Sequence, residues 1–436
     1  QPISTEILQE SGRKARAAFF YNGGIKKTKR LKTCSGFEIE GTPNHRIKVL
    51  DQDFNISWKY LEDIKEGDIA CLNYKRGLFP EEYVSFSEYT HQEIKNLPEH
   101  LNEDWGEMLG VLVGDGTWAS DKNVVVTVGE NDFKDVLILK MVNLFGKVSC
   151  YSVEDANAYR VVCHSKKHRD LLHEIGWGIK TPLKDKSVPE IILRSPKSVV
   201  CSFLRGLFET DGYVSSTGAN KEISLCSASL ELLRQVHTLL MNVGIVSSYS
   251  VRENVEGKIS GRVRIKGLES YRTFCREIGF ISARKTKALK DLESSLRRAH
   301  DFFIRGLGKY LKERGVSSKY ITSTDSISFA NVRKVLDKGK VSNALKDKLE
   351  YILDTNYFFD PISFVEDSEC HVYDLNVPDG SMFVGNCFTN HNTTISACIA
   401  AYETYKLIKK GDPQKYYGLP ASNNIQIISV ATDKDQ

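Results

Sequence analysis

Met108-Leu-Gly-Val-Leu-Val-Gly-Asp115-Gly116 and Leu204-Arg-Gly-Leu-Phe-Glu-Thr-Asp211-Gly212 are two copies of one pattern, in which a largely apolar run ends in Asp-Gly. Each copy has two small residues four positions apart, Gly110 and Gly114 in the first, Gly206 and Thr210 in the second. In a helix this spacing places both on one face. Small side chains let two helix backbones approach closely, so the pattern predicts two helices packed side by side.

A carboxylate stands at the end of each predicted helix. We expect Gly116 and Gly212 to take the left-handed conformation that terminates many helices. Two such helices side by side would hold Asp115 and Asp211 close together at one end. Converging carboxylates bind a hard cation such as Mg²⁺ through oxygen. A metal ion there would activate water and neutralise a phosphodiester transition state.

The segments that follow the two copies also repeat. Residues 143–153 return as residues 242–251, and Glu174-Ile-Gly-Trp177 returns as Glu277-Ile-Gly-Phe280. A single Asp-Gly after an apolar run usually marks only a helix end or a hairpin turn. Two copies, each followed by segments that also repeat, indicate a duplicated unit over residues 100–290. Helical and strand patterns alternate in this region.

These segments resemble the LAGLIDADG (dodecapeptide) homing endonucleases. The resemblance implies a pseudo-twofold αββαββα endonuclease over residues 76–290, whose two β-saddles straddle a long, asymmetric target on double-stranded DNA. It implies that Asp115 and Asp211 bind Mg²⁺ and that a lysine lies near each active centre. Lys186 matches the first, and Lys287 is taken as the second, with Lys285 as the alternative. Residues 252–287 hold ten Lys and Arg against four Asp and Glu, which suits phosphate contacts.

Short β-type runs lie on both sides of this unit, at residues 29–33, 37–40, 46–50 and 68–72, and again from Tyr357 to Phe388. They carry Gly41-Thr42-Pro-Asn-His45-Arg, Val372-Tyr-Asp374-Leu-Asn-Val377 and Asn390-His391-Asn392-Thr393-Thr394. Bracketing such a nuclease, they resemble an intein. Thr42 and His45 match its first TxxH block, and Asp374, His391 and Asn392 match its C-terminal block.

The resemblance assigns a step to each of these side chains. The amide of Asn392 would attack its own backbone carbonyl and cleave the Asn392–Thr393 bond. His391 would act as general acid, and Thr393 would accept an acyl group through its hydroxyl. His45 would destabilise the upstream scissile amide, and Asp374 would manage protons between the steps.

The resulting expectation is a multidomain α+β chain. Residues 1–75 and 355–392 would form a Hint β-horseshoe, with the endonuclease inserted between them. Residues 291–354 would be a helical linker or a DNA-recognition subdomain. Residues 393–436 would be a short α/β C-extein fragment that resembles the P-loop ATPase of phage terminase large subunits.

Three features depart from the intein pattern. Ser381 stands where many inteins have another histidine, and Cys387 replaces the common glycine after Asn386. The Cys- or Ser-initiated first block is not found before Thr42. Both ends of the chain look truncated, so we expect a missing N-terminal segment in cis or in trans.

The composition agrees with a folded chain of two to four domains. Its 436 residues are 41% hydrophobic and 27% charged, with a net charge of +4. No run of eighteen apolar residues occurs, so a membrane span is not expected. The ten cysteines contain no CxxC pair, which argues against a zinc ribbon. We expect a monomer in the cytoplasm of a phage, bacterial or archaeal host cell.

Two other interpretations stay open. In one, the chain is a nuclease-only, maturase-like or RNA-binding LAGLIDADG protein with a decayed splicing domain. In the other, it is a packaging ATPase with an inert insertion. Retention of His391-Asn392-Thr393 argues against the second.

Overall fold

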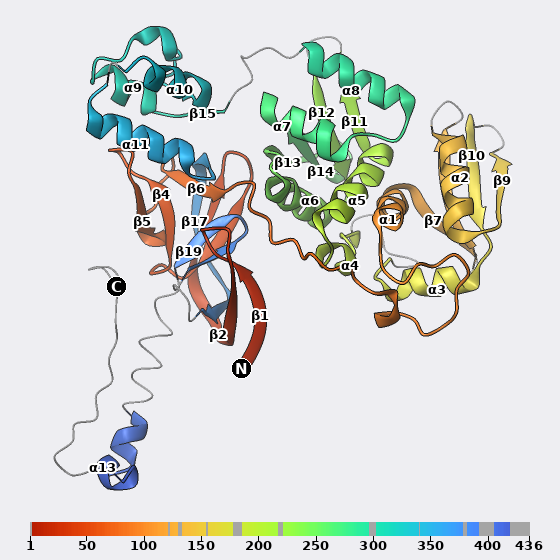
Figure 1. The fold of residues 1–436 in the computed structure, drawn as a ribbon, viewed down its shortest axis with the longest axis horizontal. Helices are drawn as coiled ribbons and strands as arrows, with labels where there is room; N and C mark the ends of the chain where they lie inside the picture. Colours follow the sequence, from red (N-terminus) through yellow and green to blue (C-terminus); the bar gives the residue numbers. More distant parts are fainter. Residues whose placement is uncertain are drawn as a thin grey trace.

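The computed structural model describes residues 2–120, 123–129, 133–153, 156–177, 185–216, 221–295, 302–339, 341–377, 382–391 and 405–418. Within these residues the chain is a mixed α+β structure (Figure 1), as expected. It holds a nine-stranded sheet, two four-stranded sheets and a small two-stranded sheet. Segments from both ends of the sequence meet in the nine-stranded sheet, and the middle of the chain forms the rest.

The nine-stranded sheet is antiparallel and curled. Its strands lie in the order β1 (Pro2–Leu8), β2 (Lys14–Thr33), β17 (Tyr357–Asn376), β6 (Ile69–Asn73), β19 (Phe388–His391), β4 (Arg46–Leu50) and β5 (Ile56–Tyr60), with β3 (Glu38–Gly41) on β2 and β18 (Met382–Gly385) on β19. The 20-residue strand β17 pairs with β6 at its start and with β2 over the rest of its length. This strand therefore joins the two parts of the sheet.

The sequence predicts this sheet only in part. The four strands expected near residues 29–33, 37–40, 46–50 and 68–72 are confirmed, and so is the return of β structure at Tyr357. The sequence did not indicate that β2 begins at Lys14. No residue from 19 to 27 is buried, so this part of β2 lacks the alternation that marks a half-buried strand.

Two αββαββα units follow one another in the middle of the chain, in the order expected. The first comprises α1 (Glu103–Asp115), β7 (Gly116–Ser120), β8 (Asn123–Gly129), α2 (Lys134–Phe145), β9 (Val148–Ser152), β10 (Ala158–Cys163) and α3 (Lys166–Glu174). The second comprises α5 (Lys197–Thr210), β11 (Gly212–Ser215), β12 (Glu222–Ser227), α6 (Leu230–Val243), β13 (Ser247–Glu253), β14 (Ile259–Ile265) and α7 (Leu268–Thr273). Their sheets have matching orders, β7-β8-β10-β9 and β11-β12-β14-β13. The short α4 (Glu190–Leu193) precedes α5, and α8 (Ala283–Ser295) closes the second unit.

A helical subdomain lies against the nine-stranded sheet (Figure 1). It contains β15 (Phe303–Ile304), α9 (Leu307–Lys312), β16 (Ile327–Ser328), α10 (Phe329–Asp337) and α11 (Asn343–Asp354). Its buried residues form one hydrophobic cluster with Leu50, Tyr357 and Phe359 of the sheet. Residues 302–354 are therefore a packed unit rather than an extended connection.

The second unit also packs against the nine-stranded sheet. Met241 and Val246 share a hydrophobic cluster with Leu31 and other buried residues of that sheet. The ring of Phe37 stacks on the ring of His237 with centroids 3.9 Å apart. Burial lowers the pKa of His237 to about 3, so this interface holds a neutral imidazole at physiological pH.

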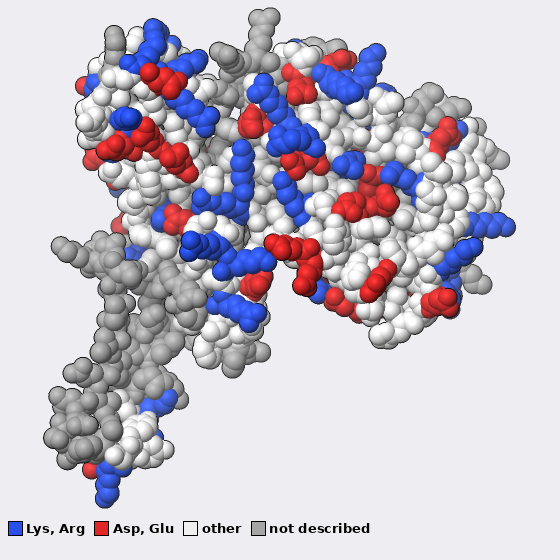
Figure 2. All heavy atoms as spheres, in the orientation of Figure 1, with Lys and Arg blue, Asp and Glu red and all other residues white. Residues whose placement is uncertain are grey.

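Charged side chains cover much of the surface. On the face in Figure 2, Lys and Arg gather along the middle of the molecule and over the helical subdomain, with acidic residues interspersed. Among the described residues, no helix is both long and apolar enough to cross a membrane.

Candidate functional site

Helices α1 and α5 pack backbone to backbone through their glycines. A Cβ atom on Gly110 would collide with the carbonyl oxygen of Phe203, and one on Gly206 would collide with that of Glu107. Nearer the helix ends, a Cβ atom on Gly114 would collide with the side chain of Thr210. The small-residue face predicted from the sequence is therefore the contact surface of the two helices.

The predicted left-handed caps are wrong. Gly116 has φ −73° and extended backbone, and Gly212 is not among the positive-φ glycines. Each glycine instead begins a strand directly after its helix. A side chain at Gly116 would collide with the Leu112 carbonyl, and one at Gly212 with the Phe208 carbonyl. Glycine is needed there for space rather than for its left-handed conformation.

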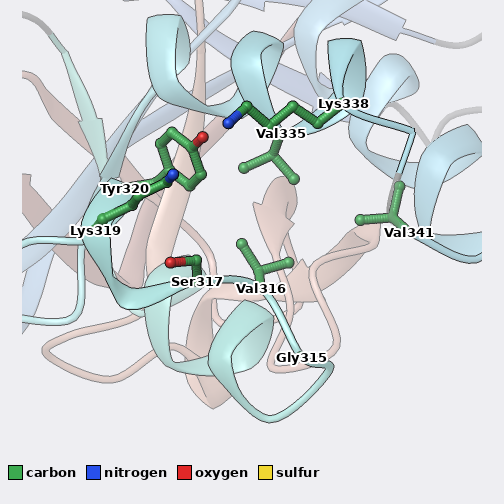
Figure 3. Close-up of a pocket in the computed structure, with 8 residues that line it drawn as sticks. All are labelled: Gly315, Val316, Ser317, Lys319, Tyr320, Val335, Lys338 and Val341. Atoms are coloured by element: carbon green, nitrogen blue, oxygen red, sulfur yellow. The ribbon is translucent and has the colours of Figure 1, made fainter.

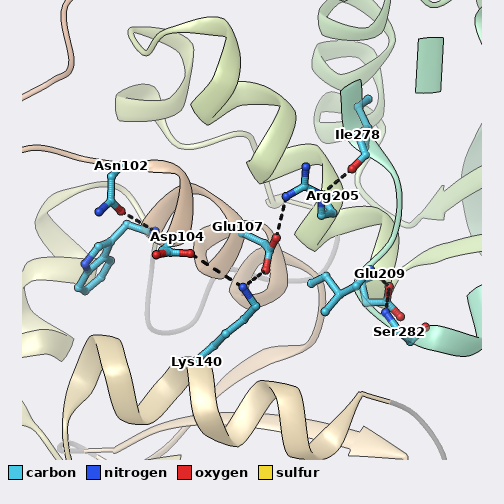
Figure 4. Close-up of polar contacts among 10 residues, drawn as sticks. Asn102, Asp104, Glu107, Lys140, Arg205, Glu209, Ile278 and Ser282 are labelled. Atoms are coloured by element: carbon cyan, nitrogen blue, oxygen red, sulfur yellow. Dashed lines mark hydrogen bonds and ion pairs between the residues drawn. The ribbon is translucent and has the colours of Figure 1, made fainter. Parts of the chain in front are cut away.

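A buried ion cluster ties α1, α2 and α5 together (Figure 4). Glu107 of α1, only 5% exposed, pairs with Arg205 of α5 at 3.1 Å and with Lys140 of α2 at 2.7 Å. A buried carboxylate needs such partners, because an uncompensated charge is costly in the interior. Arg205 also donates to the carbonyl oxygen of Ile278 at 2.5 Å. The cluster fixes how α1 and α5 are aligned.

Glu209 of α5 holds the start of α8 in place. Its carboxylate accepts hydrogen bonds from the backbone N–H groups of Ile281 at 2.6 Å and Ser282 at 3.0 Å (Figure 4). These contacts fix the chain just before α8. Because α8 carries Lys285, Glu209 also determines where that lysine lies.

A lysine caps the end of each long helix. The ammonium group of Lys186 donates to the carbonyl oxygen of Gly114 at 2.6 Å. Lys285 donates to the carbonyl oxygens of Phe208 at 3.3 Å and Gly212 at 2.8 Å, and also to that of Glu209. The two lysines therefore occupy equivalent places in the two units.

The structure places Lys285, rather than Lys287, against the end of α5. Lys287 is exposed on α8, whereas Lys285 is buried at the end of α5. The spacing on α8 explains the difference, since residues two apart in a helix face different directions. The sequence left both lysines open, and the structure brings Lys285 to the site.

Asp115 and Asp211 differ in their surroundings. Asp115 is exposed, and Asp211 is half-buried. Burial raises the pKa of Asp211, while the positive charges of Lys186 and Lys285 act in the opposite direction. Lys186 therefore contacts the end of α1 and also acts on the carboxylate at the end of α5. We call Asp115, Asp211, Lys186 and Lys285 the helix-end site.

The helix-end site offers only oxygen ligands to a metal. Within the described ranges, no group of three or more His, Cys, Asp or Glu residues could hold a metal ion. A cation here would therefore have the carboxylates of Asp115 and Asp211, neighbouring backbone carbonyls and water. Mg²⁺ prefers oxygen ligands and keeps several waters, so these residues fit it.

The predicted residues Thr42, His45, Asp374 and His391 come from three distant segments. Thr42 and His45 form a turn before β4, in which the His45 N–H donates to the Thr42 carbonyl at 2.9 Å. The imidazole Nε2 of His45 lies 2.8 Å from Oδ1 of Asn390 on β19. Asp374 on β17 is close enough to His45 to oppose the lowering of its pKa by burial. We call His45, Asp374, Asn390 and His391 the strand site.

His391 ends β19 at the edge of the described chain. It pairs with Arg46 of β4, and its ring lies edge-on to Trp58 with centroids 5.0 Å apart. Burial, with the charges of Arg46, His45 and Lys48, lowers the pKa of His391 to about 4. Asn392, Thr393 and Ser381 lie outside the described residues.

Asn386 and Cys387 form the tight turn between β18 and β19. Both have positive φ, 47° and 69°, which is unusual for residues other than glycine. Cys387 is nevertheless buried in the core of the sheet. Cys387 therefore adopts the backbone conformation that glycine favours, and its side chain adds an apolar contact to the core.

The sequence did not identify Asn390 as a member of the strand site, or Trp58 as a neighbour of its His391 ring. Asn390 immediately precedes His391, which was the one available signal. Trp58 lies on β5, and only the pairing of β5 with β4 brings it to His391.

One comparison with a family of known proteins falls on the second αββαββα unit. Residues 198–279 match the family model of the LAGLIDADG-like domain. Replicative DNA helicase DnaB of Rhodothermus marinus is 23% identical over 413 residues, which cover 87% of this chain and 41% of the helicase. Glutamine–fructose-6-phosphate aminotransferase of Methanocaldococcus jannaschii is 26% identical over 353 residues, 76% of this chain and 31% of that protein. A DNA gyrase subunit of Mycolicibacterium flavescens is 23% identical over 422 residues, 90% of this chain and 70% of that protein.

The chain thus spans less than half the length of the first two of these relatives. Among solved structures, a mesophilic variant of the homing endonuclease I-DmoI is 18% identical, with a TM-score of 0.33 over 43% of this chain and 97% of that one. The N-terminal LAGLIDADG domain of DUF199/WhiA is 17% identical, with a TM-score of 0.29 over 41% of this chain and 81% of that one. The match over residues 198–279 identifies a LAGLIDADG-like domain within this chain.

Proposed function

We propose that residues 76–290 are a homing endonuclease that cleaves double-stranded DNA at the helix-end site with Mg²⁺. The observation that carries the proposal is the reach of Lys186, which bonds the end of α1 and acts on Asp211 at the end of α5. Two acidic helix ends within reach of one ammonium group can act on one short stretch of phosphodiester backbone. The match to the LAGLIDADG-like domain supports the same conclusion.

The residues of the helix-end site would divide the work of hydrolysis. Asp115 and Asp211 would hold a metal ion, which would supply an activated water and offset negative charge on the phosphate. Lys186 and Lys285 add fixed positive charge beside the carboxylates, where it stabilises a phosphate that gains negative charge. Because backbone carbonyls hold both ammonium groups, the lysines need little rearrangement during the reaction.

The endonuclease is tested by incubating the chain with Mg²⁺ and a library of plasmids that carry randomised inserts. We expect a subset of plasmids to be linearised, with their cut ends sharing one long asymmetric sequence. Asp115→Asn should abolish this cleavage while the chain remains folded. Equal cleavage by wild type and Asp115→Asn would reject the helix-end site as the catalytic centre.

We also propose that residues 1–75 and 355–392 are the splicing domain of an intein with a Hint fold. The strand site supports this, because His45, Asp374 and His391 come together from segments on either side of the nuclease. The relatives support it as well. Three-quarters or more of this chain matches part of a helicase, of an aminotransferase and of a gyrase. An element inserted into each of these proteins explains the three matches better than any activity that their names describe.

The proposed C-terminal step is cyclisation of Asn392. Its side-chain nitrogen attacks its backbone carbonyl carbon, the bond to the nitrogen of Thr393 breaks, and a succinimide forms. The departing nitrogen takes a proton from His391, and the attacking nitrogen loses one, so protons balance. The freed Thr393 would begin a C-extein with a terminase-like ATPase sequence.

This step can be followed in the chain itself. We expect mass spectrometry to detect a released segment of residues 393–436 and a longer fragment that ends in succinimide. Asn392→Ala should stop the release. Continued release from that variant would favour the nuclease-only interpretation, with ordinary proteolysis as the source of the fragment.

We propose further that the helical subdomain contacts DNA rather than acting only as a linker. It holds a cavity of about 280 Å³ lined by Gly315, Val316, Ser317, Lys319, Tyr320, Val335, Lys338 and Val341 (Figure 3). The ammonium groups of Lys338 and Lys319 lie 5.4 Å and 5.1 Å from the ring centroid of Tyr320, and they lower its pKa. No lining residue is acidic. Two ammonium groups beside one phenol suit a phosphate group, and residues 302–354 hold eleven Lys and Arg against six Asp and Glu.

The salt dependence of DNA binding tests the subdomain contact. Each lost phosphate contact lowers the slope of log K against log salt by about one. The double variant Lys319→Ala/Lys338→Ala should therefore lower the slope by about two. Lys346→Ala is the matched control, because Lys346 lies on the same subdomain but pairs with Glu350. A slope equal to that of the control would exclude this contact.

A further inference from the structure

Asn390 is almost completely buried beside His45, with only 2% of its surface exposed. Its side chain makes two hydrogen bonds. The nitrogen Nδ2 donates to the carbonyl oxygen of Phe388 at 2.9 Å, and the oxygen Oδ1 lies 2.8 Å from Nε2 of His45. Both polar atoms of the amide are therefore hydrogen-bonded.

The orientation of this amide is set by its surroundings. An amide nitrogen donates but does not accept, so it must face the Phe388 carbonyl, and the oxygen must then face His45. Backbone pairing of Asn390 with Ile47 on β4 holds the residue in register. Gly385 of β18 leaves room for the amide, since a Cβ there would lie 3.2 Å from Nδ2.

The proton of His45 follows from this orientation. An amide oxygen only accepts hydrogen bonds, so Nε2 of His45 must carry the hydrogen. Burial lowers the pKa of His45, which favours the neutral ring. A neutral imidazole has one N–H. The other nitrogen, Nδ1, is then left with its lone pair.

We propose that Asn390 is a positioning residue that fixes the tautomer of His45, with the proton on Nε2 and the acceptor on Nδ1. The proposal deepens the proposed splicing function and rests on it for its consequence. In that reaction, Nδ1 is the ring nitrogen available to accept a hydrogen bond from the upstream scissile amide. Asn390 also stands next to His391, so one residue connects the groups assigned to the first and the last steps.

The position of the proton is measured by NMR of the full chain labelled with ¹⁵N-histidine. The signal of His45 is assigned by its loss in His45→Gln. We expect the wild-type chain to show a protected hydrogen on Nε2 and an unprotonated Nδ1. In Asn390→Leu, which keeps the size of the side chain but has no acceptor, the protected Nε2 hydrogen should be lost. A wild-type proton on Nδ1, or an unchanged His45 signal in Asn390→Leu, would overturn the proposal.

Two further variants make the result independent of folding. Asn390→Asp keeps the shape and supplies a charged acceptor, so it should retain the Nε2 hydrogen and shift the titration of His45 to higher pH. No upward shift in a folded Asn390→Asp chain would contradict the proposal. Asn44→Ala changes an exposed residue of the same turn and should leave the His45 signals as in wild type. Since none of these signals requires bond cleavage, a chain with the predicted tautomer but no Asn392-dependent release would reject splicing and retain the Asn390 contact.

Discussion

The ammonium group of Lys186 lies 2.6 Å from the carbonyl oxygen of Gly114, at the end of α1. The same charge also acts on Asp211, at the end of the neighbouring helix α5. In the second unit, Lys285 bonds the carbonyl oxygen of Gly212, directly after Asp211. Each acidic helix end is therefore bonded by its own lysine, and Lys186 also acts on the carboxylate of the neighbouring helix end.

Because α1 and α5 approach closely, any side chain added at the glycines between them should lower the free energy of unfolding. Gly110→Ala would place a methyl group against the Phe203 carbonyl oxygen, and overpacking of this kind costs about 3 kcal/mol. Urea unfolding should show that loss. Gly129→Ala is the control, because nothing lies within 4 Å of a Cβ there. Equal stability of the two variants would mean that the helices do not pack through their glycines.

The two lysines of α8 give a matched pair of variants. Lys285→Met removes the donor to three carbonyl oxygens and should lower the free energy of unfolding by about 1–3 kcal/mol. It should also slow DNA cleavage about 100-fold, the scale of losing one electrostatic stabiliser. Lys287→Met changes an exposed side chain, and its single-turnover rate on saturating DNA should stay near that of wild type. The reverse ranking would restore Lys287 as the second lysine.

Substitution of Asp211 should raise the stability of the fold but abolish DNA cleavage. Burial raises its pKa, so its favourable contribution to folding is present at low pH and is lost as pH rises through the folded pKa. Asp211→Asn should therefore unfold at a slightly higher temperature at pH 7, although it cleaves no DNA. Release of residues 393–436 should be unaffected. Loss of that release in a folded Asp211→Asn chain would contradict the division into two separate sites.

Much of the fold was predictable because the chain repeats itself. The small-residue face of the helices and the αββαββα order follow from residues 108–116 and 204–212 and the segments in step with them. The strand site was harder to derive. His45 and His391 were found as motifs, but their partners Asn390 and Trp58 depend on how β4, β5 and β19 pair. Such pairing between distant segments leaves no periodic signal in the sequence.

One local error and one open choice have physical causes as well. Gly116 and Gly212 were expected to adopt left-handed caps, but the lack of a Cβ serves close packing against the preceding turn. The sequence left open whether Lys287 or Lys285 is the second lysine. Only the position of α8, held by Glu209, decides which of the two faces the site.

The low pKa of His391 predicts a steep pH dependence of C-terminal cleavage. Its pKa is lowered to about 4, so the protonated form is scarce at pH 7. If this form supplies the proton to the departing nitrogen, the rate should rise about tenfold for each unit of pH between 7 and 5. His391→Gln should remove the dependence. A wild-type rate that is flat over this range would show that His391 does not act as the acid.

Protonation of His391 should lower the stability of the fold at acidic pH. Because the unfolded histidine binds its proton near pH 6.5 and the folded one only near pH 4, the stability contributed by neutral His391 is lost as pH falls between these values. Thermal unfolding of wild type and His391→Gln should therefore diverge at neutral pH and converge towards pH 4. If the unfolding temperatures of the two chains differed by the same amount at every pH, burial would not lower the pKa of His391.

The central claim is that one chain carries two separable chemistries, a DNA-cleaving centre at Asp115 and Asp211 and a peptide-cleaving centre at Asn392. The most direct measurement is the mass of the products formed by three purified chains, wild type, Asp115→Asn and Asn392→Ala. We predict that the first two release residues 393–436 at equal rates and that Asn392→Ala releases nothing. Release from Asn392→Ala, or its absence from a folded Asp115→Asn chain, would contradict the account.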